Sequence, residues 1–364
     1  MKQLNDIFPA TAPNAIDALR ENWKRIRAEQ PRIRIRDAAA RLGVSEAELL
    51  VTEEWSMRLV PDWKSLLSRF HDLGRVMALT RNEHCVIENT GRFGEPKFFQ
   101  HGGGLVLGPE IDLRFFFSVW HFAFAIEQET AQGLRRSFQF FDPAGDAVFK
   151  LHLKDEADSE LFHTLSHQFA NVEETGPLII ERKAPEELPE QSPETVLENR
   201  DEFRAAWRGL RDTHDFHKLL RKFNLKREDA LRLAGEEFAV ELKSAAVDHA
   251  LEIARNNGQP IMVFVGNRGM IQIFTGKIHR LVRSDEWLNV LDPSFNLHLR
   301  TTGVASAWLV RKPTVDGIVT SVECFDAGGG LVAQLFGQRK PGQPERDDWR
   351  KLTGILDTPE WKKK

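Results

Sequence analysis

The sequence predicts an α+β protein built as a tandem structural repeat, in which each half is a large antiparallel β-sheet with flanking helices. Two observations predict this fold class. Residues 75–141 consist of short β-rich segments joined by tight turns, which is typical of antiparallel strands and not of parallel βαβ units. The same blocks of sequence recur after residue 199. One domain of helices and antiparallel strands has therefore been duplicated.

The first half begins with two predicted helices and ends with a third. Apolar residues at helical spacing run over Ile16–Ile26 and Arg36–Leu50, and Ser45 with Glu48 forms a capping-box pattern inside the second helix. β-rich segments separated by turn residues come next, and a helix over Leu151–Val172 closes the half. The predicted strands are 76–80, 85–87, 105–107, 113–117, 120–126 and 137–141.

The repeat is visible as matching residues at a constant spacing. Val76–Asn82 matches Ile261–Asn267, and Ser137–Gly145 matches Ser321–Gly329. Five blocks share an offset of 184 or 185 residues, which indicates a duplicated domain. We therefore predict an N-terminal repeat over residues 1–173, a Pro- and Glu-rich linker over 174–198 and a C-terminal repeat over 199–364.

The composition argues against several classes of protein. The 364 residues are 41% hydrophobic and 29% charged, with a formal net charge of −4, so no basic field favours nucleic acid or an anionic membrane. No apolar stretch approaches a membrane span, and residues 1–20 lack the apolar core of a signal peptide. Cys85 and Cys324 form no CxxC motif and fit a reducing compartment. We expect a cytoplasmic protein without stable membrane insertion.

A histidine-bearing helix is the main functional candidate. Residues 212–223 predict a helix that begins after Asp212 or Thr213 as the N-cap. One side of this helix is apolar and should pack into a core. That side is formed by Phe216, Leu219, Leu220 and Phe223.

Two histidines lie off this apolar face. His214 lies roughly opposite the apolar face, and His217 lies between the two faces of the helix. The positive end of a helix disfavours imidazolium, so a neutral, metal-binding imidazole is favoured in the first turn. A solvated surface histidine is the alternative. No histidine precedes His71, so the matching helix of the first repeat has none. A side chain absent from one copy of a scaffold is not needed for folding, which favours a functional role for His214.

Cations follow two apolar runs in the second half. Lys312 ends one predicted strand, and Arg339 follows another in which Phe336 shares a face with two glutamines. Together with a histidine, 25 phenylalanines and nine tryptophans, they suit a large, flat, apolar ligand with acidic substituents. Solvated side chains are the alternative. Arg114 lies in a very apolar stretch where an unpaired guanidinium is costly, so an ion pair is the alternative to function there.

Several segments resemble a known family. The likeness extends along nearly the whole chain and includes Thr80–Glu83 and Asp112–Arg114 in the first half. The chain resembles the HemS/ChuS/PhuS/HmuS family, which are bacterial cytoplasmic haem-binding proteins of haem-uptake systems, often described as haemin-degrading factors. The segments of the second half that carry the resemblance are 262–269, 272–276, 287–289, 295–299 and 311–314.

The resemblance implies a duplicated α+β fold that holds one haem b in a cleft of the second half and covers it from the first. His214 matches the axial ligand of the haem iron, and Arg114 matches an arginine that reaches over the opposite face. The residues that match the surroundings of the propionates and the pocket are Lys312, Arg339 and Arg227. His217, one helical turn from His214, would be a substitute ligand.

Two positions depart from the family pattern. Phe336 stands where many members have tyrosine, which keeps the ring and removes the hydroxyl. Ile87 stands where some members have a further histidine proposed to bind haem, so a second haem site of that type is not expected.

The resemblance leaves two functions open. In the first, the chain takes haem from an importer of the ABC class and opens the macrocycle as a non-classical haem oxygenase, with an electron donor and with Arg114 as the catalytic residue on the distal side. In the second, it is a non-catalytic haem carrier or store that delivers haem to a separate haem oxygenase. A haem-free duplicated domain is a third possibility, which would leave the absence of His214 from the first repeat unexplained.

Overall fold

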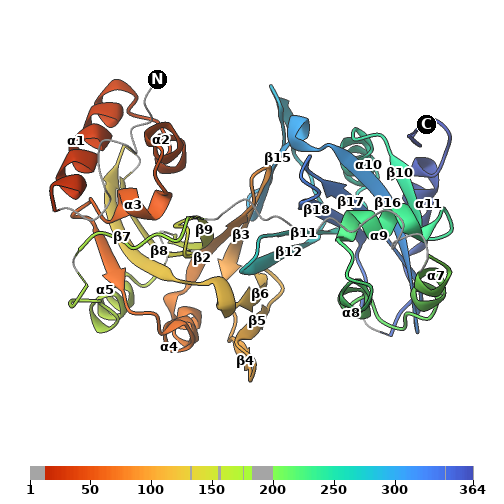
Figure 1. The fold of residues 1–364 in the computed structure, drawn as a ribbon, viewed down its shortest axis with the longest axis horizontal. Coiled ribbons are helices and arrows are strands. Elements are labelled where there is room, and N and C mark those ends of the chain that lie inside the picture. The colour runs from red at the N-terminus through yellow and green to blue at the C-terminus, as the bar shows by residue number, and fades with distance from the viewer. Residues whose placement is uncertain are drawn as a thin grey trace. The chain divides into compact units, whose positions relative to one another are not determined.

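The computed structural model describes residues 13–131, 133–154, 157–174, 176–182, 200–340 and 342–363. Its strands form two nine-stranded antiparallel sheets with flanking helices, which confirms the predicted α+β class (Figure 1). The chain divides into two compact units. Unit 1 is formed by Met1–Thr80, Thr90–Glu186 and Asn267–Met270, and unit 2 by Arg81–Asn89, Glu187–Gly266 and Ile271–Lys364. The predicted linker lies largely outside the described residues, and the three predicted boundaries stay predictions.

The helices of unit 1 differ from the expected ones at two places. The long helix predicted over Arg36–Leu50 is wrong, because Gly43 adopts a left-handed φ of +69° and ends the first helix there. The capping box is confirmed, but it begins a separate helix: the Ser45 hydroxyl accepts from the Glu48 amide at 3.2 Å. The helices of this unit are α1 (Pro13–Glu29), α2 (Ile35–Leu42), α3 (Glu46–Leu50), α4 (Trp63–Ser68) and α5 (Ser159–Gln168).

The predicted closing helix over Leu151–Val172 is also too long. Its first residues, Leu151 to Leu153, belong to a strand that pairs with two neighbours, and α5 begins only where the Asp158 carboxylate accepts from the Leu161 amide.

Unit 1 contains two runs of paired strands. One is β1 (Ser56–Leu59), β7 (Phe122–Thr130), β8 (Gly133–Phe141), β9 (Ala147–Leu153) and β2 (Arg75–Arg81), and the other is β6 (Asp112–Phe116), β5 (Gly103–Leu107) and β4 (Lys97–Phe99).

Unit 2 repeats this arrangement and has one more strand in each run. Its strand runs are β10 (Ala239–Leu242), β16 (Ser306–Thr314), β17 (Gly317–Phe325), β18 (Leu331–Gly337), β11 (Ile261–Gly266) and β12 (Met270–Gly276), and then β3 (Cys85–Arg92), β15 (Phe295–Arg300), β14 (Trp287–Leu291) and β13 (Leu281–Ser284). Its helices are α7 (Arg200–Arg208), α8 (Asp215–Lys222), α9 (Arg227–Ala234), α10 (Ala246–Asn256) and α11 (Asp347–Leu356). Both cysteines are free and buried in the core of this unit.

The elements themselves confirm the tandem repeat. β7, β8 and β9 of the first half recur as β16, β17 and β18, each with the same length and with its first residue 184 positions further along. The short 3₁₀ turn Phe117–Val119 recurs in the same way as Thr301–Gly303. Copies of one sequence pattern have therefore folded into copies of one structure.

Matching asparagines, Asn82 and Asn267, tie each unit together. Asn82 belongs to the first repeat but lies in unit 2, where its amide donates to the carbonyls of Gly266 and Val332 at 3.2 and 2.8 Å. Asn267 belongs to the second repeat but lies in unit 1, where its amide donates to the Val148 carbonyl at 2.9 Å. Each unit thus contains a turn from the opposite repeat, fixed to its backbone by an asparagine.

We expect Asn82→Ala to lower the free energy of unfolding by about 2–4 kcal/mol, because it leaves the carbonyls of Gly266 and Val332 without their donor and removes the acceptor of the Cys85 amide. Urea unfolding followed by tryptophan fluorescence measures this loss. Asn256→Ala, at an exposed position of α10, is the matched control and should change little. Equal unfolding curves for both variants would contradict the proposed role of Asn82.

Candidate functional site

The predicted histidine helix forms, but it begins later than expected. α8 starts at Asp215 with His214 as its N-cap residue, so the assignment of Asp212 or Thr213 as the N-cap is wrong. The cause is a turn before the helix, in which the Asp212 carbonyl accepts from the Asp215 amide and the Asp212 carboxylate accepts from the His214 amide at 2.8 Å. Asp212 therefore caps the turn and not the helix.

The apolar face of α8 lies where the sequence predicts it. Phe216 and Leu219 are buried, and Leu220 and Phe223 pack against the same cluster. The ring of Phe216 lies 4.7 Å from that of Trp207 on α7. The core formed by α7, α8, α9 and the neighbouring strands therefore fixes the helix and directs its opposite side outward (Figure 1).

His214 presents an oriented imidazole to the surface. Its side chain is 89% exposed, and its Nδ1 lies 2.6 Å from the Asp212 carboxylate. The backbone hydrogen bond from His214, followed by the side-chain hydrogen bond and the charge of the ring, lowers the pKa of Asp212. A charged Asp212 favours the tautomer with the proton on Nδ1, which leaves the Nε2 lone pair free for a metal. Asp212 was predicted only as a cap; an acid two residues before a histidine at the start of a helix was the available signal for this contact.

A buried group of charges lies beneath this helix. The Glu323 carboxylate on β17 is fully buried and accepts two hydrogen bonds from Arg227, at 2.6 and 2.9 Å. It also accepts from Lys312 at 2.6 Å and from the Ser321 hydroxyl at 2.9 Å. The two cations lower the pKa of Glu323 in spite of its burial. We call Arg227, Lys312 and Glu323 the buried charge triad.

The buried charge triad supports α8 directly. Arg227 and Lys312 lie 5.1 and 4.8 Å from the centre of the Phe216 ring, within the range of cation–π attraction. His217 is exposed on the same helix, but the protein packed around one side of its ring lowers its pKa, and the charges of Arg227 and Lys312 lower it further. His217 is therefore a neutral base near neutral pH.

Lys312 does not lie at a solvated strand end. It is 3% exposed within β16, so the solvated alternative is wrong for this residue. Arg227 is also mostly buried. Glu323, the partner that Lys312 and Arg227 share, was not predicted as a site residue. Its counterpart in the first repeat is Gln139, which donates to Ser137 at 3.0 Å, so an acid in place of this glutamine was a signal in the sequence.

Arg339 and Phe336 lie on the β18 side of the same unit. Arg339 makes a loose ion pair with Asp316 at 3.6 Å, and its charge also contributes to lowering the pKa of Asp212. Phe336 is half-buried and its ring lies 5.0 Å from that of Phe264. The residues expected around the ligand in the second half thus share unit 2.

Arg114 lies in unit 1, on β6. It forms an ion pair with Asp112, so the ion-pair alternative holds, although the side chain keeps part of its surface exposed. Residues directly opposite one another in a sheet share a face. Phe99, Gly103 and Phe116 form one such row, and Phe116 shares a face with Arg114 two residues away. Phe99 and Phe116 are exposed, so Arg114 lies on an accessible, partly aromatic face.

Ile87, which stands where some family members have a further histidine, is fully buried in the core of unit 2.

A family model for the haemin-degrading HemS.ChuX domain matches residues 43–169 and 224–356. The chain belongs to this family. It is 39% identical over 344 residues to the hemin transport protein HmuS of Yersinia pestis, covering 93% of this chain and 97% of the relative. Holo-PhuS, a heme-binding protein from Pseudomonas aeruginosa, is 46% identical with a TM-score of 0.89, over 93% of this chain and 97% of that one. The heme degrading enzyme ChuS of Escherichia coli O157:H7 is 35% identical with a TM-score of 0.86, and the match covers 93% of this chain and 99% of that one.

No group of three or more His, Cys, Asp or Glu side chains among the described residues is placed to hold a metal ion. None of the helices in these residues is long and apolar enough to cross a membrane.

Burial of Lys312 predicts a pH dependence of stability. Burial lowers its pKa to about 8 from the ordinary 10.5, although Glu323 opposes the shift. Between these values the unfolded chain binds more protons than the folded one, so this group makes the protein more stable as pH rises from about 8 to 10.5. Over that interval we expect wild type to gain about 1–3 kcal/mol relative to Lys312→Met. Urea unfolding at several pH values measures the difference. Lys243→Met, at an exposed lysine, is the control, and its free energy of unfolding should change with pH as that of wild type does. The same pH dependence in Lys312→Met would contradict the prediction.

Proposed function

We propose that the chain binds haem, with Nε2 of His214 as the axial ligand of the iron. The observation that carries the proposal is the exposed imidazole whose Nδ1 is held by the Asp212 carboxylate. A metal-binding histidine usually has such a partner on its second nitrogen, which fixes the ring and raises its basicity. The relatives are named as hemin transport or heme-binding proteins, which supports haem as the ligand.

The other residues of unit 2 divide into two proposed roles. Arg339 makes one loose ion pair, so its guanidinium can turn to a haem propionate. Lys312 and Arg227 are engaged by Glu323, and we assign them to holding Phe216 and α8 in place. Phe336 and Phe264 offer half-buried rings to a flat macrocycle, where a tyrosine would have added a hydroxyl.

A bound haem iron supplies reversible ligation and, with an electron donor, oxygen chemistry. The residues of this chain bind it and fix its orientation. Arg114 would offer guanidinium protons from an aromatic face, which suits hydrogen bonding to an oxygen ligand. This face and the likeness to the heme degrading enzyme ChuS support haem degradation as the first candidate. The alternative is a non-catalytic carrier or store that receives haem from an importer and delivers it to a separate oxygenase.

We expect His214→Ala to weaken the binding of haemin at least about tenfold, because it removes the iron ligand. An absorbance titration at the Soret band measures the affinity. His217→Ala is the matched control on the same helix and should change the affinity less than about threefold. A Soret spectrum and affinity that are the same in His214→Ala and wild type would exclude His214 as the ligand, and no saturable band in the wild type would exclude haem.

We expect Asp212→Asn to weaken haemin binding by about tenfold and to raise the reduction potential of the bound haem, since a neutral amide makes the ring a weaker donor to ferric iron. Spectroelectrochemistry measures the potential. Asp215→Asn, which removes a neighbouring carboxylate paired with Lys218, is the control and should leave the potential near that of wild type. Equal shifts in the two variants would show a general effect of charge and not of the histidine partner.

Degradation and carriage are separated by adding a reductant to the haem complex under air with catalase present. An oxygenase converts the haem to an open-chain tetrapyrrole, and Arg114→Ala then slows the loss of the Soret band. A carrier keeps its haem intact under the same conditions. Loss of the band only when catalase is omitted would identify free peroxide as the cause and contradict an enzymatic role.

A further inference from the structure

Arg339, the cation assigned to a haem propionate, has a carboxylate of the protein beside it. Its guanidinium lies 3.6 Å from the Asp316 carboxylate, and the two side chains are only 22% and 20% exposed. At this distance the groups form an ion pair but no direct hydrogen bond. Asp316 therefore holds the charge of Arg339 nearby without fixing the direction of its N–H groups.

Asp316 lies on a turn that hydrogen bonds hold in place. This turn is the tip of the hairpin formed by β16 and β17. The Asp316 amide donates to the Thr314 hydroxyl at 3.2 Å, and that hydroxyl donates to the Gly317 carbonyl at 2.7 Å. The Val315 amide donates to the Arg211 carbonyl at 3.0 Å, which ties the tip to the chain just before the turn that leads into α8. Asp316 thus owes its position to the backbone and not to Arg339.

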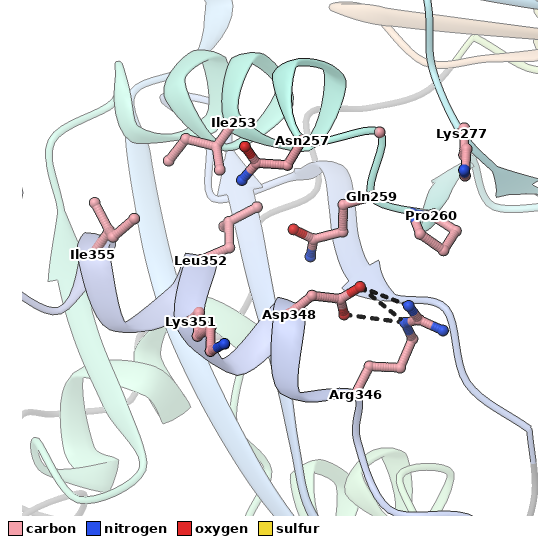
Figure 2. A pocket seen from close by; sticks show the side chains of 11 residues that line it. Ile253, Asn257, Gln259, Pro260, Lys277, Arg346, Asp348, Lys351, Leu352 and Ile355 are labelled. Atoms are coloured by element: carbon pink, nitrogen blue, oxygen red, sulfur yellow. Dashed lines mark hydrogen bonds and ion pairs between the residues drawn. The ribbon is translucent and has the colours of Figure 1, made fainter.

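The chain between β18 and α11 carries two arginines that differ in how they are held. Arg346 donates to both oxygens of Asp348, at 3.0 and 2.6 Å, so its guanidinium is occupied (Figure 2). Arg339 donates no hydrogen bond from its guanidinium to any described residue and has only the loose ion pair. Its neighbourhood is fixed, because the Gly342 amide donates to the Asp316 carboxylate at 3.0 Å. Of these two arginines, Arg339 is therefore the one that can exchange its partner.

Two other acids are affected by the charge of Arg339. The backbone hydrogen bond from His214 is the main cause that lowers the pKa of Asp212, and the charge of Arg339 adds to this lowering. Burial raises the pKa of Glu345, and hydrogen bonds together with the charge of Arg339 oppose the rise. Of these three acids, Asp316 is the one within ion-pair distance of Arg339. Arg339 thus lies near the turn that bears the proposed iron ligand, with Asp316 as its partner.

We propose, on the basis of the haem function inferred above, that Asp316 competes with a haem carboxylate for Arg339. In the free protein Asp316 holds the guanidinium at the site. A bound haem carboxylate replaces it through direct, charge-assisted hydrogen bonds, which are stronger than a loose ion pair. Asp316 then remains nearby as a like charge, which weakens binding and speeds release. It is a positioning residue that acts through Arg339.

Transfer of haemin from the full chain to excess apomyoglobin, followed by absorbance, measures the rate constant of release. Asp316→Asn keeps an oxygen that can accept from the Gly342 amide but removes the charge. We expect it to slow release about three- to tenfold, because one negative charge near the ligand carboxylate is lost. Asp347→Asn is the matched control, since Asp347 also pairs loosely with an arginine, Arg350 at 3.5 Å. It should change the rate less than about twofold.

Two further comparisons separate this role from a structural one. In the Arg339→Gln background, Asp316→Asn should change the release rate less than about twofold, because the residue through which Asp316 acts is absent. Haemin dimethyl ester has no ionised carboxylate. It should therefore leave wild type and Asp316→Asn at the same rate.

Unchanged or faster release of haemin from Asp316→Asn overturns the proposal. An equal effect of Asp316→Asn on haemin and on its dimethyl ester also overturns it, as does an undiminished effect in the Arg339→Gln background. If Asp316→Asn does not fold, as its thermal transition would show, Asp316→Ser decides by the same comparisons. A wild type without a saturable Soret band would instead contradict the proposed haem function, and the role of Asp316 with it.

Discussion

The site of unit 2 depends on one buried carboxylate. Glu323 is fully buried, and it is tolerated because Arg227 and Lys312 both bind it. Removing one partner from such a group costs about 3–5 kcal/mol, since it leaves a charge uncompensated in the interior. The same two cations contact the Phe216 ring, so the charge balance of the sheet fixes the helix that carries His214.

The two repeats share strands of equal length but differ in the charges that these strands carry. In the first repeat the position of Glu323 is Gln139, and that of Lys312 is Gln128, so neutral amides stand where the second repeat has charges. Strands β7 and β8 match β16 and β17 residue for residue, so the fold requires neither of these charges. The second repeat alone combines the buried charge triad with His214. The two repeats therefore share a scaffold and differ in the charges buried within it.

The sequence carries most of the fold and part of the site. Constant spacing predicted the duplication, and apolar periodicity predicted the buried face of α8 through Phe216 and Leu219. Helix boundaries were less certain, because Gly43 and the turn at Asp212 are decided by local hydrogen bonds that compete with the apolar pattern. Glu323 could not be assigned to Lys312 and Arg227, because their pairing depends on register between strands and on packing against α9.

Nothing in the sequence pointed to the pairing of Asp316 with Arg339 either. An acid in a hairpin turn is ordinarily solvated, and this contact arises because the chain that follows β18 returns to the tip of the hairpin formed by β16 and β17. Features of this kind come from tertiary packing and have no local signature.

The most direct test of the central claim is pulsed electron paramagnetic resonance of the ferric haem complex prepared with ¹⁵N-labelled histidine. We predict hyperfine coupling to one axial imidazole in wild type and in His217→Ala, and its disappearance in the double variant His214→Ala/His217→Ala, even where some haem still binds. Loss of the coupling in His217→Ala, or its persistence in the double variant, would show that the iron is held by another residue, and the role given to His214 and Asp212 would then be wrong.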